Sequence, residues 1–210
     1  MIHALIADDH ALVRRGIREV LEEGGDIRVT GEASHAGEVL ALLEKVPCDV
    51  VVLDINLPGR SGLDVLEDLR RERPGLPVLI LTVYSEEQYA LRALKSGAAG
   101  YLTKEAVPER LVEAVRKVVA GGRYITPTLA ERLASMVRGG FEGAPHDLLS
   151  EREFHVFRLL SAGKSVSEIA EAMKLSVKTV STYRARALEK LGLKSNAELT
   201  QYAVRNGLLE

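Results

Sequence analysis

Short apolar runs alternate with amphipathic stretches along the first 120 residues. The apolar runs predict five β-strands, which are Ile2 to Ala7, Ile27 to Ala33, Asp49 to Asp54, Val78 to Thr82 and Gly100 to Leu102. Between them, segments such as ALVRRGIREVLEE repeat apolar residues every three or four positions, as helices packed on a sheet do. The alternation predicts an α/β fold, a doubly wound five-stranded parallel sheet with helices on both faces.

The last third of the chain has helical spacing throughout. Its apolar periodicity predicts four short helices, at about 151–161, 166–173, 177–191 and 196–206. Three Ser-x-x-Glu patterns stand at helix starts: Ser150 with Glu153, Ser165 with Glu168, and Ser195 with Glu198. In such a capping box the serine accepts from a helix N–H and the glutamate returns a bond, and Ser176 is a fourth candidate N-cap. This region therefore predicts an all-α four-helix domain.

A punctuated segment separates the two patterns. The stretch AGGRYITP interrupts the periodicity, TLAERLASMV has the spacing of a short helix, and RGGFEGAPHD is rich in glycine with a proline. We therefore predict three parts: a domain over residues 1–121, a linker with a short helix over 122–147, and a second domain over 148–210.

Length and composition favour an intracellular globular protein. With 210 residues and 46% hydrophobic content the chain can bury a sizeable core. The single cysteine, Cys48, excludes an internal disulfide framework. The N-terminus does not suit a signal peptide and no apolar run approaches membrane-spanning length, so we expect a cytoplasmic protein without membrane association.

The net charge of -2 hides a difference between the two halves. Residues 1–122 carry 15 Lys and Arg against 20 Asp and Glu, whereas residues 123–210 carry 13 against 10. From 174 to 194 six cations face one acid: Lys174, Lys178, Arg184, Arg186, Lys190 and Lys194 against Glu189. Such a basic patch on a mildly acidic protein is typical of a nucleic-acid contact.

Polar side chains follow four of the predicted strands. Asp8 and Asp9 come directly after the first, Asp54 ends the third, Thr82 closes the fourth and Lys104 follows the fifth. In a parallel sheet these ends meet at one edge, where functional crevices form. Three neighbouring carboxylates repel unless a cation lies among them, and hard oxygen ligands suit Mg²⁺. With the hydroxyl and ammonium as anion ligands, the set predicts a phosphoryl-aspartate site. Taken singly, each of these residues is also ordinary turn chemistry.

Four stretches, ALIADDH, VVVLDINLPGRSG, VLILTVYSEE and GAAGYLTKE, resemble the response-regulator receiver domain in order and spacing. That domain has a flavodoxin-like fold. The resemblance implies that Asp54 is the phosphoacceptor, that Asp8, Asp9, Asp54 and the backbone carbonyl of Asn56 hold Mg²⁺, that Thr82 and Lys104 contact the phosphoryl oxygens, and that Tyr101 is an aromatic switch. Glu105 stands where many receivers have proline, so the cis-proline geometry of that loop cannot be assumed here. His10 is expected in the loop above the site without ligating.

The stretch SVSEIAEAMKLSVKTVSTYRARALEKLGLKS predicts two helices joined by a tight turn at 174–176. The helical period places Val177, Val180, Ala187 or Leu188, and Leu191 on an inward face. The opposite face carries the candidate DNA contacts, which are Lys178, Thr179, Ser181, Thr182 and Arg186. Arg184 falls on the side of Val180, so we expect its stem to pack and its head to reach a phosphate.

The segment from LSEREFHVFRLL to LEKLGLKS is similar to the LuxR-type four-helix DNA-binding domain, so the full chain resembles a NarL/FixJ-type response regulator. This resemblance implies a sensor histidine kinase and double-stranded DNA as partners, with RNA polymerase as a further candidate. It also implies a homodimer on DNA through the last helix, where Leu199, Tyr202 and Ala203 form an apolar strip, although a strip that narrow more often packs within its own domain. The chain would then catalyse only its own phosphorylation and dephosphorylation.

Two other functions are compatible with parts of the pattern. One is an aspartyl-phosphate phosphohydrolase with Asp54 as nucleophile, but haloacid-dehalogenase-like enzymes need Asp-x-Asp, and here Asn56 follows instead. The other is a receiver that never gains phosphate and acts by protein contacts alone, although its acid, threonine and lysine set is complete.

Overall fold

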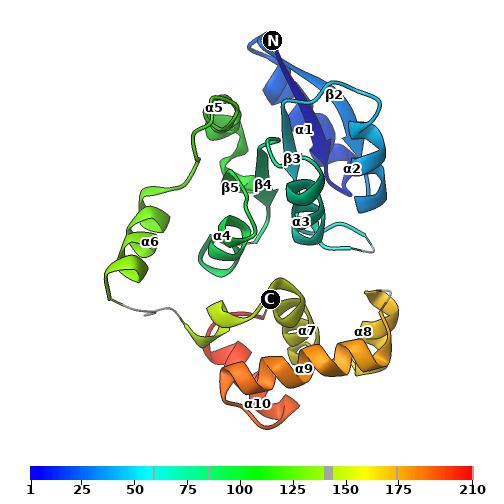
Figure 1. The fold of residues 1–210 in the computed structure, drawn as a ribbon, viewed down its shortest axis with the longest axis vertical. Helices are drawn as coiled ribbons and strands as arrows, with labels where there is room; N and C mark the ends of the chain where they lie inside the picture. The colour runs from blue at the N-terminus through cyan, green and yellow to red at the C-terminus, as the bar shows by residue number, and fades with distance from the viewer. Residues whose placement is uncertain (59, 85, 140–143, 174, 210) are drawn as a thin grey trace. The chain divides into compact units, whose positions relative to one another are not determined.

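A computed structural model describes residues 1–58, 60–84, 86–139, 144–173 and 175–209. The chain forms two compact units, Met1–Ser135 and Met136–Glu210. The first contains a β-sheet, and the second is built from helices (Figure 1).

The first unit is a five-stranded parallel sheet in the order β2-β1-β3-β4-β5. The strands are β1 (Ile2–Ala7), β2 (Ile27–Ala33), β3 (Val50–Leu53), β4 (Val78–Thr82) and β5 (Gly100–Thr103). This confirms the predicted α/β fold. The third strand is one residue shorter at each end than predicted, because the backbones of Asp49 and Asp54 each make only one flanking backbone hydrogen bond to β1.

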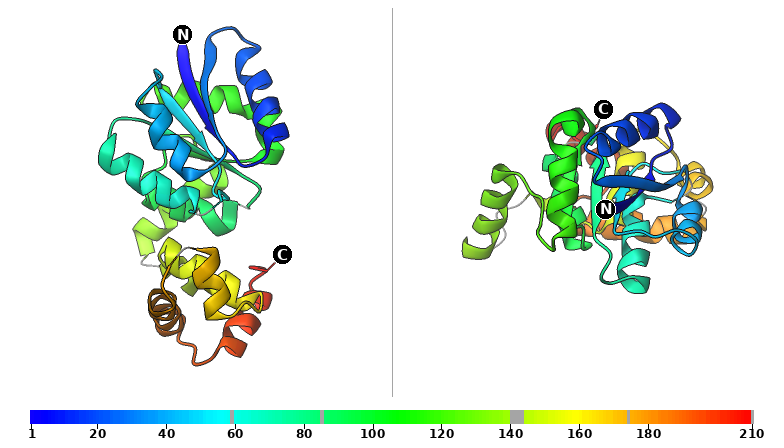
Figure 2. Two further views of the ribbon diagram at one scale, coloured as in Figure 1. Left: turned by 90° about the vertical axis from the view of Figure 1, so that its right-hand side faces the viewer. Right: turned by 90° about the horizontal axis from the view of Figure 1, so that it is seen from above.

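Helices cover both faces of the sheet (Figures 1 and 2). They are α1 (Ala11–Glu22), α2 (Ala36–Leu43), α3 (Gly62–Glu72), α4 (Glu86–Lys95) and α5 (Val107–Val119), the last preceded by a short 3₁₀ turn, η1 (Lys104–Ala106). Alternate strand residues such as Ile6 and Val52 join α1 and α5 in one apolar core. Leu5 points to the opposite face, where it lies near Leu42 of α2. Because both faces are covered, the strands are apolar along their whole length and polar groups collect at their ends.

Helix α6 (Pro127–Gly139) begins in the first unit and ends in the second. The second unit then has a 3₁₀ turn, η2 (Pro145–Leu148). Four helices come next: α7 (Glu151–Ser161), α8 (Val166–Ala172), α9 (Val177–Leu191) and α10 (Asn196–Arg205). Their limits agree with the predicted helices to within one residue. Aromatic and aliphatic side chains, among them Phe154, Phe157 and Ile169, form the core of this unit.

The predicted N-caps are present at all four helices of this unit. Ser150 and Ser165 form complete capping boxes with Glu153 and Glu168, and the side chain of Ser176 accepts from the Thr179 N–H. Ser195 also caps its helix, but Glu198 bonds to the N–H of Lys194 rather than to that of Ser195. The fourth helix start therefore lacks the reciprocal bond that its sequence pattern suggested.

Candidate functional site

The carboxyl ends of β1, β3, β4 and β5 bring the predicted polar residues to one edge of the sheet. Asp8 follows β1, Asp54 follows β3, Thr82 ends β4 and Lys104 follows β5. Asp8 and Asp54 are 1% and 2% exposed and Thr82 is fully buried, although none of the three is apolar. Burying such groups lowers the stability of the fold unless they have partners. Their position together at one edge therefore indicates a functional site rather than a structural one.

Lys104 joins the two most buried carboxylates. Its Nζ atom lies 2.6 Å from Asp8 Oδ2 and 2.6 Å from Asp54 Oδ2. The lysine stands at the first position of η1, and its peptide bond to Glu105 is trans. The structure therefore brings one cation against two carboxylates that lie 46 residues apart in the sequence.

Burial and charge act in opposite directions on these groups. Burial raises the pKa of Asp54 despite the hydrogen bond and positive charge of Lys104, which lower it. For Lys104, burial lowers the pKa, but its bonds to Asp54 and Asp8 outweigh that effect and raise it. The ammonium alone therefore does not compensate for the burial of Asp54, and a further cation near this carboxylate would favour its charged form.

Asp9 lies beside the pair and contacts His10. The His10 Nδ1 atom is 2.5 Å from Asp9 Oδ1, and the His10 N–H donates to Asp8 Oδ1 at 2.8 Å. Potential ligand atoms of Asp8, Asp9 and His10 lie within 4.8 Å of one another. With Asp54 the site offers three carboxylates against one ammonium, an excess of hard, negatively charged oxygens that fits a divalent cation such as Mg²⁺.

Thr82 and Tyr101 lie on the adjacent strands β4 and β5, and their side-chain hydroxyls differ in hydrogen bonding. The buried Thr82 hydroxyl lies close enough to Asp54 to lower the pKa of that carboxyl, but it makes no hydrogen bond of normal length and angle with any described residue. The ring of Tyr101 is 1% exposed, and its hydroxyl donates to the Tyr84 carbonyl at 2.8 Å. Tyr84 in turn stacks on Tyr89 of α4, with ring centroids 4.5 Å apart. The β4–α4 loop and β5 are thus connected directly.

The loop after Asp54 is held close to the acceptor. The Asn56 N–H donates to Asp54 Oδ1 at 3.2 Å, while the side chain of Asn56 is exposed. The Gly62 N–H donates to the Ile55 carbonyl at 2.7 Å, and Ser61 caps α3 in a box with Asp64. A β-carbon on Gly62 would lie 1.9 Å from the Asp54 carbonyl oxygen, so only glycine fits there.

We expect Gly62→Ala to lower the free energy of unfolding by about 1–3 kcal/mol, because the backbone at Asp54 must shift to admit the methyl group. Urea unfolding measures this change. Gly75→Ala is the matched control, because a β-carbon there meets no atom within 4 Å. Equal unfolding midpoints for the two variants would contradict the close contact.

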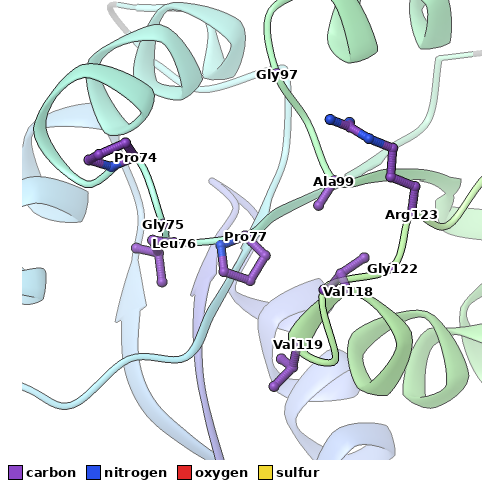
Figure 3. A pocket seen from close by; sticks show the side chains of 11 residues that line it. Pro74, Gly75, Leu76, Pro77, Gly97, Ala99, Val118, Val119, Gly122 and Arg123 are labelled. Atoms are coloured by element: carbon purple, nitrogen blue, oxygen red, sulfur yellow. The ribbon is translucent and has the colours of Figure 1, made fainter.

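A separate pocket of about 250 Å³ lies elsewhere on the same unit (Figure 3). Its lining comes from the residues before β4 and β5, from the end of α5 and from the residues that follow it, among them Pro77, Ala99 and Arg123. These positions precede the strands, whereas the acidic residues follow them. The pocket is therefore at the opposite edge of the sheet and is not part of the acidic site.

Helix α9 presents most of the predicted polar face to solvent. Lys178, Ser181, Thr182 and Arg186 are exposed, and Val180, Ala187 and Leu191 are buried. The Thr182 hydroxyl donates to the Lys178 carbonyl at 3.0 Å, and Thr179 pairs with Ser176. Exposed Ala185 lies on the same face; sequence reasoning missed it because alanine carries neither charge nor polarity.

Three details of α9 differ from the sequence analysis. Val177 was predicted to face inward but is 52% exposed, because it is the first residue of the helix and extends past the core. Lys190 was counted in the basic patch, yet its Nζ lies 2.6 Å from buried Glu153 on α7. The Arg184 Nε donates to Asn196 Oδ1 at 2.6 Å, and Lys174 lies outside the described residues. The free cations of the described face are therefore fewer than the sequence suggested.

The apolar strip of α10 packs inside its own unit. Leu199 and Ala203 are fully buried, and the Tyr202 hydroxyl lies 3.0 Å from His146 Nδ1. These side chains complete the core with Phe157, whose ring meets Tyr202 edge to face. The strip therefore packs within its own unit, as the sequence analysis also allowed, and Leu199 and Ala203 are not available for a dimer surface.

Among the described residues, none of the helices combines the length and the apolar character that a membrane span requires.

Among known protein families, residues 4–116 match the response regulator receiver domain, and residues 147–203 match the bacterial regulatory proteins of the luxR family. The response regulator UvrY of Escherichia coli K12 is 39% identical over 209 residues, which are 99% of this chain and 96% of UvrY.

Solved structures of RcsB are similar over nearly the whole chain. One is RcsB from Salmonella enterica serovar Typhimurium bound to the rprA promoter with phosphomimetic BeF₃⁻, with 26% identity, a TM-score of 0.72, and coverage of 96% of this chain and 97% of that one. Another contains two RcsB dimers on two parallel DNAs, with 27% identity, a TM-score of 0.60, and coverage of 97% and 98%. The chain therefore belongs to the two-component response regulators of the NarL/FixJ type, with a receiver domain and a LuxR-type DNA-binding domain.

Proposed function

We propose that Asp54 accepts a phosphoryl group from a phosphohistidine on a sensor kinase, and that this phosphate controls binding of α9 to duplex DNA. The observation that carries the proposal is the buried arrangement of Asp54, Asp8 and Lys104, with the Thr82 hydroxyl unsatisfied beside it. Burying such a group of polar atoms is unfavourable if its role is only structural. Its burial is explained if the group binds a phosphoryl group together with a metal cation.

The chemistry follows from the positions of these side chains. An Asp54 oxygen attacks phosphorus, a P–O bond forms, the P–N bond of the donor breaks, and the leaving imidazole takes a proton from solvent. Lys104 then pairs with the transferred group in place of Asp54, and Thr82 supplies the hydroxyl that lacks a partner beforehand. Asp8, Asp9, Asp54 and the Asn56 carbonyl would hold Mg²⁺, which offsets the negative charge that accumulates during transfer.

For the output, the exposed cations Lys178 and Arg186 are suited to DNA phosphates, and the N-terminal part of α9 to base edges. Arg184 is held by Asn196, so its role would be to reach a phosphate from a fixed position. Relatives are described as bound to promoter DNA and as dimers on DNA, which supports a homodimer on paired half-sites. Selecting random duplex DNA on the phosphorylated protein tests this output and yields its site.

We expect Arg186→Ala to weaken binding to all duplex sequences alike and to reduce the slope of log affinity against log salt by about 0.9, because one fewer counterion is released. Titrations of fluorescent duplexes at several salt concentrations measure both quantities. Arg28→Ala, an exposed cation of the receiver, is the charge-matched control and should change neither. A salt slope identical in both variants would show that Arg186 does not meet the DNA.

A further inference from the structure

Residues 123–129, between α5 and α6, are attached to the receiver at several points; we call this segment the linker clamp. It begins at Arg123, whose guanidinium donates to the Ala98 carbonyl at 2.8 Å, and ends at Leu129, which is 3% exposed. The clamp contains the first residues of α6, and α6 leads into the second unit. Any change in the clamp therefore acts where the chain leaves the receiver.

The first main attachment is a bridge to the edge of β5. The Tyr124 N–H donates to the Ala99 carbonyl at 2.9 Å, and the Tyr101 N–H donates to the Tyr124 carbonyl at 3.2 Å. A β-carbon added to Gly100 would lie 2.8 Å from the carbonyl oxygen of Tyr124 and 2.9 Å from the Cβ atom of Tyr124. The bridge thus requires glycine at this position of the strand.

The second attachment joins the clamp to α4. The Thr126 hydroxyl donates to Glu86 Oε1 at the start of that helix. The same Thr126 oxygen accepts from the Leu129 N–H at 3.2 Å and so caps α6. A hydrogen bond to a charged carboxylate is among the stronger polar contacts in proteins, so Thr126 ties the start of α6 to α4.

Both attachments involve elements that adjoin the acceptor site, because β5 leads to Lys104 and α4 follows the loop after Thr82. Tyr101 donates through its hydroxyl to Tyr84 and through its backbone N–H to Tyr124, so one residue connects the β4–α4 loop with the clamp. Glu86 belongs to the helix that follows the same loop. A shift of Thr82 toward a phosphoryl group would therefore disturb both attachments together.

We infer that the linker clamp is an autoinhibitory contact: it restrains the start of α6 in the unphosphorylated protein and is released when Asp54 carries phosphate. The inference rests on the proposed function. Release frees the linker to adopt the arrangement that two DNA half-sites require, so DNA affinity rises without any new contact between protein and DNA.

Thr126→Val tests the inference, because valine keeps the shape of threonine and removes the hydroxyl. The full chain carrying this change should bind the selected duplex about tenfold more tightly without phosphate, and should gain correspondingly less with beryllofluoride and Mg²⁺. Thr128→Val is the matched control on an exposed threonine two residues away and should behave as wild type. Equal affinities for the two variants would overturn the inference.

Glu86→Gln supplies a second variant, because it weakens the same bond and leaves the Thr126 cap of α6 intact. Glu86→Gln should also raise the DNA affinity of the unphosphorylated protein, but by less than Thr126→Val does. An unchanged affinity would overturn the inference. Hydrogen exchange gives a readout without DNA: the Tyr101 and Tyr124 amides should exchange faster with beryllofluoride, and unchanged exchange would overturn release. If exchange accelerates but wild-type DNA affinity does not rise, the proposed function fails, and the autoinhibitory role with it.

Discussion

Asp54→Asn should abolish phosphorylation of this chain. Incubating the wild-type protein with a small-molecule phosphodonor and Mg²⁺ should add one phosphoryl group, visible in the intact mass, and chelation of the metal should prevent it. Asparagine keeps the size of the side chain but removes the carboxylate oxygen that attacks phosphorus. No other described carboxylate lies at the end of a strand with Lys104 and the acids of β1 around it in this way.

The matched control is Asp49→Asn, at the other end of the same strand. Asp49 accepts from the His3 N–H at 2.8 Å and is far more exposed than Asp54, so its variant should be phosphorylated like the wild type. An adduct that persists in Asp54→Asn would refute the assignment of the acceptor. An adduct lost in both variants would point instead to general damage of β3.

Thr82→Ala should separate phosphorylation from its effect on DNA. The buried hydroxyl lies beside the Asp54 carboxylate but makes no hydrogen bond of normal length and angle there, so a phosphoryl group on Asp54 would offer it a further acceptor oxygen. We expect the variant to be phosphorylated, though more slowly, and to lose most of the gain in DNA affinity. For a coupling of about 1–3 kcal/mol the wild-type gain would be roughly 5- to 150-fold.

The coupling prediction requires adduct yield and DNA affinity from the same sample. Thr82→Ser is the control, because it keeps the hydroxyl and should keep the gain. A fully phosphorylated Thr82→Ala protein with an undiminished gain would show that the signal does not pass through Thr82.

The acidic edge was predictable from the sequence, because any parallel sheet places all carboxyl ends at one edge, so Asp8, Asp54 and Lys104 were expected there once their strands were recognised. That they touch depends also on the strand order, which places β1 beside β3 and β5 two strands from β3. The helix limits of the second unit were predictable for a similar local reason: the four serine N-caps mark them within a few residues.

Contacts that depend on tertiary packing were harder to predict. The periodicity of α9 placed Val177 inward, but a helix end can extend beyond the core it packs on. The apolar strip of α10 would have the same sequence pattern whether it packed on a second protein or on its own core. The contact between Tyr202 and Phe157 shows that it packs on its own core. The Thr126–Glu86 bond joins residues 40 positions apart, and neither residue type signals it.

The central claim is that phosphate on Asp54 raises DNA affinity. The most direct measurement is the affinity of the full wild-type chain for its selected duplex, before and after treatment with phosphodonor and Mg²⁺, with the phosphorylated fraction read from the mass of the same sample. We predict a rise of roughly 5- to 150-fold that is absent in Asp54→Asn. A fully phosphorylated protein with unchanged affinity would contradict the account.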